Sequence, residues 1–220
     1  MAEHNQVVGG YSIGEEVANA VAHGLGAAAS IVALTLMLVK ATPVLPGIDI
    51  AGIAVYGGSL IMLFLASTLY HSFTHHPTKA VLKRVDHCSI YLLIAGSYTP
   101  FLMITLHGSA RAQILLIVLW VVAVAGVIFK IFFVHRFKRA SLIAYLIMGW
   151  ASLIVVYDLY KALPHAAFNL LLAGGISYTV GAAFYAAKKY PYTHAIWHLF
   201  VLGGAVCHCV SIAVYVIPSA

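Results

Sequence analysis

The stretch ILLIVLWVVAVAGVIF, residues 114–129, contains no charged residue and only one side chain with a polar atom, the indole of Trp120. The segment LIMLFLASTLY, residues 60–70, is similarly continuous in its apolar character. A transmembrane β-strand would alternate apolar and polar residues over about ten positions, whereas a transmembrane helix needs about twenty apolar residues in a row. Both segments therefore indicate membrane-spanning helices and argue against a β-barrel.

Five further segments have the same character. The 220-residue chain is 63% hydrophobic and 8% charged, and cutting it at every Asp, Glu, Lys and Arg leaves seven uncharged runs of at least eighteen residues. Seven spans use roughly 140 residues, which leaves no room for a soluble domain. We therefore expect an all-α integral membrane protein, with a short segment 1–16 before one seven-helix domain, 17–217. The expected spans are 17–39, 50–72, 86–106, 112–134, 140–160, 166–187 and 193–217.

The basic residues predict how these spans are oriented. Nine of the twelve Lys and Arg residues follow spans two, four and six, and three follow spans one, three and five. By the positive-inside rule, the N-terminus lies in the cytoplasm and the C-terminus outside a cell (inner or plasma) membrane. Topology and contact with lipid head groups account for these charges, so no nucleic-acid partner is implied. The nine are Lys79, Lys83, Arg84, Lys130, Arg136, Lys138, Arg139, Lys188 and Lys189.

Few ionisable residues remain inside the spans, and each is a functional candidate because an unpaired ionisable group is costly in a bilayer. The predicted topology assigns each of them a depth. His23, His71, Asp86, His194 and His198 all fall near the cytoplasmic face, although they come from four different spans. His208 does not belong to this layer, because fourteen residues of helix place it about 21 Å beyond His194.

Three of these histidines have the pattern of a zinc site. His194 and His198 are four residues apart and share one helix face, and His71 is the best third ligand because of its depth. Three neutral imidazoles with a fourth position open to water are typical of catalytic zinc. Asp86 would accept a proton from that water or hold it in place, and Ser67 would donate a hydrogen bond to the water or to a substrate carbonyl.

A structural interpretation of the same residues stays open. Two histidines at this spacing also serve as hydrogen-bonding partners of neighbouring helices, and His71 with Asp86 would form a polar pair across a helix hairpin. Glu16, Asn19 and His23 share a face of span one, where a polar clamp between helices and a part in catalysis are both possible interpretations.

Five motifs in order carry a resemblance to a known family. They are EEVANAVAHG (15–24), GGSLIMLFLASTLYH (57–71), DHCSIYLLIAGSYTPF (86–101), HRFK (135–138) and HAIWHLFVLGGAVCH (194–208). Over nearly its whole length the chain resembles the haemolysin III-like, TrhA-type branch of the progestin and adipoQ receptor family.

The resemblance implies a seven-helix bundle with a cytoplasmic N-terminus and a zinc ion near the inner face. It assigns the metal ligands to His71, His194 and His198, and contact with zinc-bound water to Asp86. It also matches Ser67 to the family's span-two serine. The positions of Glu16, Asn19 and His23 match as well, and there the resemblance favours a supporting role.

Three functions follow as hypotheses. The first is a protein of membrane lipid and energetic homeostasis whose zinc site hydrolyses a lipid amide or ester, as the similarity to alkaline ceramidases implies, with membrane lipids as substrates. The second is a non-enzymatic sensor of the membrane state with structural zinc. The third is a haemolytic pore, but a water-filled pore needs polar residues through its full depth, whereas here they gather at one face.

Overall fold

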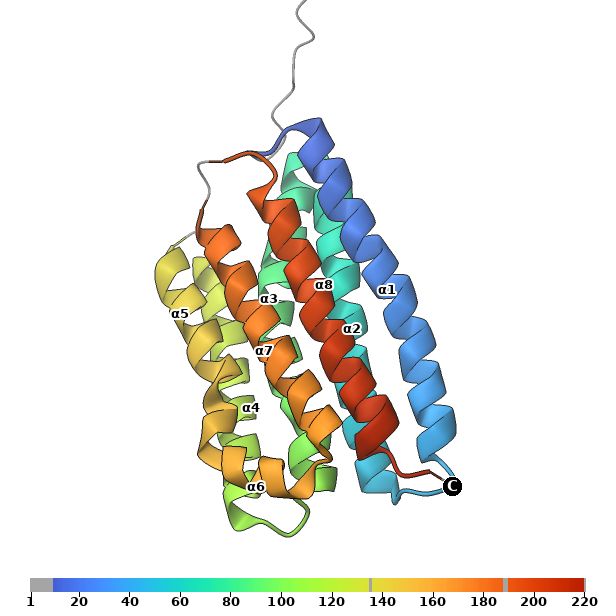
Figure 1. Ribbon diagram of the computed structural model, residues 1–220. Helices are drawn as coiled ribbons and strands as arrows, with labels where there is room; N and C mark the ends of the chain where they lie inside the picture. Colours follow the sequence, from blue (N-terminus) through green and yellow to red (C-terminus); the bar gives the residue numbers. More distant parts are fainter. Residues whose placement is uncertain (1–9, 135, 188–189, 220) are drawn as a thin grey trace, which may run out of the picture.

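The computed structural model describes residues 10–134, 136–187 and 190–219, which form an all-helical bundle (Figure 1). Within these described ranges, seven helical segments are long and apolar enough to cross a membrane, so the predicted fold class is confirmed. The α-helices are α1 Ile13–Ala41, α2 Gly47–Ser72, α3 His76–Pro100, α4 Ala110–Phe133, α5 Lys138–Gly149, α6 Val156–Ala162, α7 His165–Ala186 and α8 Thr193–Ser211. Shorter helical turns are the π-helical η1 Phe101–Thr105 and η3 Ile212–Val216 and the 3₁₀ turn η2 Ala151–Val155.

The way in which the helices pack brings together polar residues from segments that are far apart in the sequence. Helix α1 packs against both α2 and α8, α2 packs against α3, and α7 packs against α8 (Figure 1). Helices α1 and α8 begin, and α2 ends, at one end of the bundle. Residues at the start of α1, the end of α2 and the start of α8 therefore meet, although most of the chain separates them. Which end faces the cytoplasm stays a prediction from the charge distribution.

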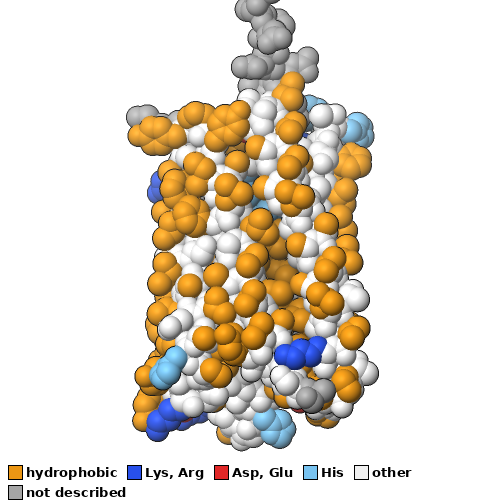
Figure 2. Space-filling model, turned by 45° about the vertical axis from the view of Figure 1, so that its right-hand side comes forward, with side chains coloured by type: hydrophobic (Ala, Val, Ile, Leu, Met, Phe, Trp, Pro, Cys, Tyr) orange, Lys and Arg blue, Asp and Glu red, His pale blue; other side chains and the backbone are white. Residues whose placement is uncertain are grey.

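The outer surface is apolar along the length of the bundle. Leu25, Leu36 and Phe132 are 66%, 64% and 73% exposed, and many other large apolar side chains resemble them. Figure 2 shows hydrophobic side chains over the whole visible face, with charged ones near its ends. A water-soluble monomer does not expose apolar surface on this scale, whereas a surface in contact with lipid does.

Helix α1 begins at Ile13, earlier than residue 17, where the sequence predicts the first span. Ser12 and Glu15 form a capping box, in which the Ser12 side chain accepts from the backbone N–H of Glu15 and the Glu15 carboxylate accepts from the Ser12 N–H. This pairing satisfies N–H groups that the first turn leaves without partners. As a result Glu16 belongs to the first helical turn and is buried in the bundle.

The predicted fifth span, 140–160, is interrupted in the structure. It consists of α5, η2 and α6, and the break follows Gly149. The hydroxyl of Tyr98 on α3 donates to the Gly149 carbonyl at 2.6 Å and accepts from the Ser152 N–H at 3.0 Å. These bonds satisfy backbone groups that would otherwise be unpaired within the membrane.

Candidate metal centre

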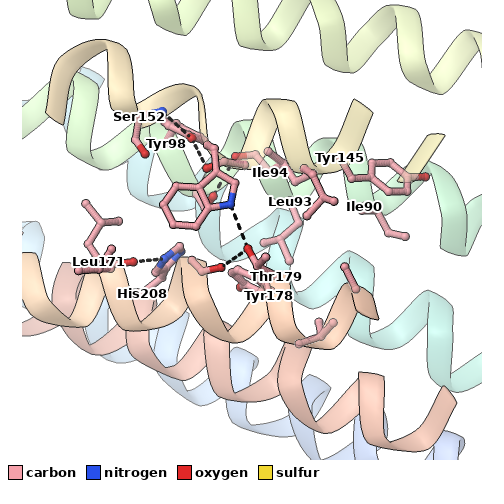
Figure 3. A pocket seen from close by; sticks show the side chains of 18 of the residues that line it. Ile90, Leu93, Ile94, Tyr98, Tyr145, Ser152, Leu171, Tyr178, Thr179 and His208 are labelled. Atoms are coloured by element: carbon pink, nitrogen blue, oxygen red, sulfur yellow. Dashed lines mark hydrogen bonds between the residues drawn. The ribbon is translucent and has the colours of Figure 1, made fainter. Parts of the chain in front are cut away.

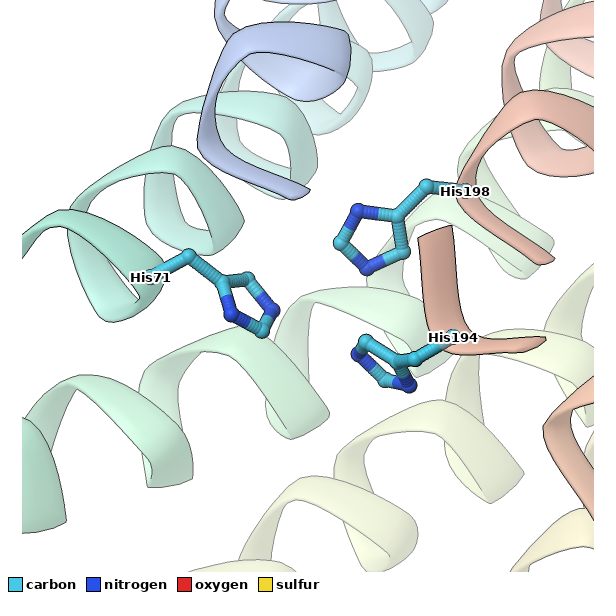
Figure 4. A group of neighbouring side chains, drawn as sticks. All are labelled: His71, His194 and His198. Atoms are coloured by element: carbon cyan, nitrogen blue, oxygen red, sulfur yellow. The ribbon is translucent and has the colours of Figure 1, made fainter. Parts of the chain in front are cut away.

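Three histidines from two helices converge at the end of the bundle where α1 begins. His71 lies in the last turn of α2, and His194 and His198 lie one turn apart on the first part of α8 (Figure 4). One ring nitrogen from each lies within 4.8 Å of those of the other two. Ligand nitrogens around a tetrahedral zinc ion, with bonds of about 2.0–2.1 Å, lie roughly 3.4 Å apart. Modest side-chain rotations would therefore bring all three to bonding distance.

The hydrogen-bond partners of His71 and His198 contact Nδ1 of each ring and leave each Nε2 free to bind a metal. The Glu16 carboxylate lies 2.5 Å from Nδ1 of His71, and the Asn19 backbone carbonyl lies 3.4 Å from Nδ1 of His198. Carboxylates and carbonyls only accept, so each Nδ1 carries the hydrogen and each Nε2 keeps a lone pair. The Asn19 amide also lies 3.4 Å from Nδ1 of His71, but the shorter contact with Glu16 determines the tautomer.

The two Nε2 atoms are buried and have no hydrogen-bond partner among the described residues. An unpaired polar atom is costly in such surroundings, and a bound cation removes that cost. A carboxylate or carbonyl that orients the far nitrogen of each ligand is typical of histidine-bound zinc. The donor set present here therefore fits a zinc ion.

Glu15 and Glu16 connect the first turn of α1 to different neighbours. Glu15 accepts at 2.8 Å from the N–H of Tyr192, the residue that precedes α8. Glu16 pairs with His71 of α2 and with Lys79 of α3, whose Nζ lies 2.9 Å from Oε1. Of the span-one residues proposed as a supporting cluster, Glu16 and Asn19 thus contact the histidine group directly.

His23, the third member of that cluster, stacks on His198 with ring centroids 3.6 Å apart and planes 7° apart. Its ring also meets the edge of Phe64 at 4.9 Å. Neither ring nitrogen of His23 has a hydrogen-bond partner among the described residues. His23 is therefore packed against a candidate ligand without being held by a bond of its own.

Asp86 and Ser67 are buried near the three histidines but do not belong to the group of candidate ligands. The Asp86 carboxylate lies 3.2 Å from Nδ1 of His87, and Asp86 lines the same cavity as His23. The Ser67 hydroxyl is buried without a hydrogen-bond partner in the described part of the chain. The roles predicted for both residues stay predictions.

No pattern in the sequence placed two residues of this region, Tyr11 and Lys79, at the site. Tyr11 lies over the group, with its ring centroid 4.8 Å from that of His194, and burial raises the pKa of its phenol, so it stays neutral. Lys79, expected to contact lipid head groups, is only 6% exposed, because it pairs with Glu16. In the sequence, Lys79 served only as one of the basic residues that predict topology, and nothing there indicated that its side chain is buried. No spacing pattern marks Tyr11.

An apolar cavity of about 190 Å³ lies inside the bundle next to this centre, and its lining includes His23 and Asp86 but none of the three histidines of the centre. Trp197 also lines the cavity. Leu171 of α7 and His208 of α8 are further lining residues and lie side by side in Figure 3. His208 stands about 15 Å beyond His198 on α8, as ten residues of helix require. Its Nε2 donates to the Leu171 carbonyl at 3.2 Å, so His208 is not part of the metal centre.

Comparisons with known proteins agree with this architecture. A family profile described as "Haemolysin-III related" matches residues 11–209. The chain is 48% identical over 206 residues to "Hemolysin-3" of Bacillus cereus, covering 94% of each chain. It is 49% identical over 195 residues to "Hemolysin-3 homolog" of Bacillus subtilis, covering 89% of this chain and 91% of that one. It is also 31% identical over 173 residues to the human "Monocyte to macrophage differentiation factor", covering 75% and 70% of the two chains.

Proposed function

This chain belongs to the haemolysin III-related family of multi-pass membrane proteins. We propose that it is a zinc-dependent hydrolase of lipid amides or esters that serves membrane lipid and energetic homeostasis. The observation that carries the proposal is the cavity. Its apolar walls reach Asp86 and His23, and His23 stacks on the candidate ligand His198. A chamber of this kind suits a lipid chain whose polar linkage lies beside the three histidines.

The residues around the centre have the chemistry that hydrolysis requires. Zinc held by His71, His194 and His198 would supply a Lewis acid for the carbonyl and an activated water. Water adds to the acyl carbon, and the bond from that carbon to the amide nitrogen or ester oxygen breaks. Asp86 takes up the proton of the water and passes it to the departing amine or alcohol. Ser67 donates a hydrogen bond to the carbonyl oxygen.

Release of free fatty acid tests this proposal. Zinc-loaded protein in lipid nanodiscs would be incubated with defined N-acyl and ester lipids, and the products measured by mass spectrometry. We expect the wild type to release fatty acid from at least one lipid. Asp86→Asn should reduce the rate by about 10²- to 10⁴-fold at unchanged zinc content, because general acid–base catalysis contributes that much.

Asp49→Asn is a matched control, because Asp49 is also buried but lies in the first turn of α2, at the other end of that helix from His71. Its rate should equal that of the wild type. No release from any lipid by zinc-loaded wild type would contradict the proposal and favour a sensor with structural zinc. So would an Asp86→Asn variant as fast as the wild type.

The cavity also bears on the word haemolysin in the names of the relatives. Most of the side chains that line it are apolar, so they offer no continuous polar path along the bundle. A water-filled pore needs such a path. We therefore expect liposomes that contain the protein at low density to retain a trapped dye.

A further inference from the structure

Lys79 is a buried cation with three partners. Its Nζ lies 2.9 Å from Oε1 of Glu16 and donates to the backbone carbonyls of Tyr70 at 3.0 Å and Phe73 at 3.1 Å. It also lies over the Tyr70 ring, 4.9 Å from its centroid. Burying an ammonium group is costly unless it is paired, so this set of contacts calls for an explanation.

The ion pair with Glu16 leads directly to a candidate metal ligand. Glu16 places Oε1 beside Lys79 and Oε2 beside Nδ1 of His71, at 2.5 Å. The contact with Lys79 fixes the orientation of the Glu16 carboxylate. An ionised carboxylate can only accept, so it holds the hydrogen on Nδ1 and leaves the Nε2 lone pair of His71 for a metal.

The two carbonyl contacts act on the backbone around His71. Tyr70 precedes His71 within α2, and Phe73 directly follows Ser72, the last residue of that helix. The Tyr70 carbonyl lies in the last turn of α2, where carbonyls have no donor within the helix, and the Phe73 carbonyl lies just beyond that turn. Lys79 donates to both from the first turn of α3. The backbone on both sides of His71 is therefore held by the same ammonium group that orients its side chain through Glu16.

We propose that Lys79 is a positioning residue of the metal centre. It sets the tautomer of His71 through Glu16, and it sets the location of His71 through the carbonyls of Tyr70 and Phe73. This inference rests on the proposed metal centre but not on hydrolysis, because positioning of His71 matters equally for catalytic and for structural zinc.

Metal affinity provides the test. Zinc dissociation constants would be measured by competition with a chromogenic chelator, and the geometry of the site by the visible spectrum of the cobalt-substituted protein. We expect Lys79→Met to weaken zinc binding about 10- to 100-fold, the usual effect of losing an outer-shell partner, and to alter the cobalt spectrum. Lys79→Arg should restore part of the affinity. Arg84→Met, a half-buried basic residue later on α3, is the control and should bind zinc as the wild type does.

A double-mutant cycle separates positioning from general damage. If Lys79 acts largely through Glu16, then Lys79→Met should weaken zinc binding much less in a Glu16→Gln background than in the wild type. Should Lys79→Met fail to fold, Lys79→Gln keeps the test, because its amide retains donors but lacks the charge.

Each failure has a distinct meaning. A wild type that binds zinc while the uncharged Lys79 variants bind it equally well overturns this inference alone. Fully multiplicative effects of Lys79→Met and Glu16→Gln would overturn the part of the inference in which Lys79 acts through Glu16. A wild type that binds no zinc overturns the metal centre and this inference with it.

Discussion

The imidazole of His23 lies in van der Waals contact with that of His198, yet both of its nitrogens lack hydrogen-bond partners among the described residues. Each buried polar group without a partner costs about 1–3 kcal/mol. A side chain that costs stability and also lines a cavity is typical of a functional site. We therefore expect His23 to contact the substrate and not merely to fill space.

His23→Phe tests this expectation. Phenylalanine keeps the aromatic ring and its stacking but removes the unpaired nitrogens, so the free energy of unfolding should rise by about 1–3 kcal/mol. Fatty-acid release should fall at least tenfold, while zinc content stays the same. Thermal unfolding and the lipid assay measure the two effects on the same preparation. A less stable variant with full activity would instead identify His23 as a packing residue.

Residue spacing and depth could identify the three candidate ligands in the sequence, because a helix fixes the relation of His194 to His198 and topology fixes the level of His71. The orienting partners were less predictable. The contact of Glu16 with His71 depends on how α1 packs against α2, and the Asn19 contact with His198 uses a backbone carbonyl, which no side-chain pattern reveals. Burial of Lys79 depends on the same packing.

Helices α1 and α2 approach each other closely because a glycine of α2 faces α1. A Cβ atom on Gly57 would lie within 2.9 Å of both Cβ and Cγ of Leu34 on α1. The next residue, Gly58, has open space at the same position. Gly57 therefore lies in the interface between α1 and α2, and Gly58 lies outside it. The absence of a side chain at Gly57 permits the close packing that brings Glu16 to His71.

This difference predicts opposite effects of the same substitution. Gly57→Ala should lower the free energy of unfolding by about 1–3 kcal/mol, because overpacking forces α1 and α2 apart. Gly58→Ala should raise it by about 0.5–1 kcal/mol, since alanine is the better helix former and meets nothing. Thermal or denaturant unfolding of both variants in one detergent measures the difference. Equal effects would contradict the packing described for α1 and α2.

Helix type and number followed from continuous apolar runs, whereas two details of the helices did not. The early start of α1 could be predicted from the capping-box residues Ser12 and Glu15. Spans that are defined only by uncharged runs do not include this signal. The break in the fifth span was not visible, because it depends on the Tyr98 hydroxyl reaching from α3. Interactions between spans decide such breaks, and periodicity within one span does not reveal them.

At the scale of the whole molecule, scarcity of charge shapes both the fold and the site. An apolar exterior confines polar side chains to the interior and the ends, and the packing of α1, α2, α3 and α8 brings most of the interior ones to a single end. The candidate metal centre thus joins helices from the beginning, middle and end of the chain. Because zinc would bind only the folded arrangement, its removal should also lower the thermal stability of the entire bundle.

The proposed function depends first on a metal ion held by His71, His194 and His198. The most direct measurement is the zinc content, by mass spectrometry of the element, of the purified wild type, a His194→Ala, His198→Ala double variant and His208→Ala. We expect about one zinc per chain in the wild type and in His208→Ala, and none in the double variant. Unchanged zinc content in the double variant would contradict the proposed metal centre.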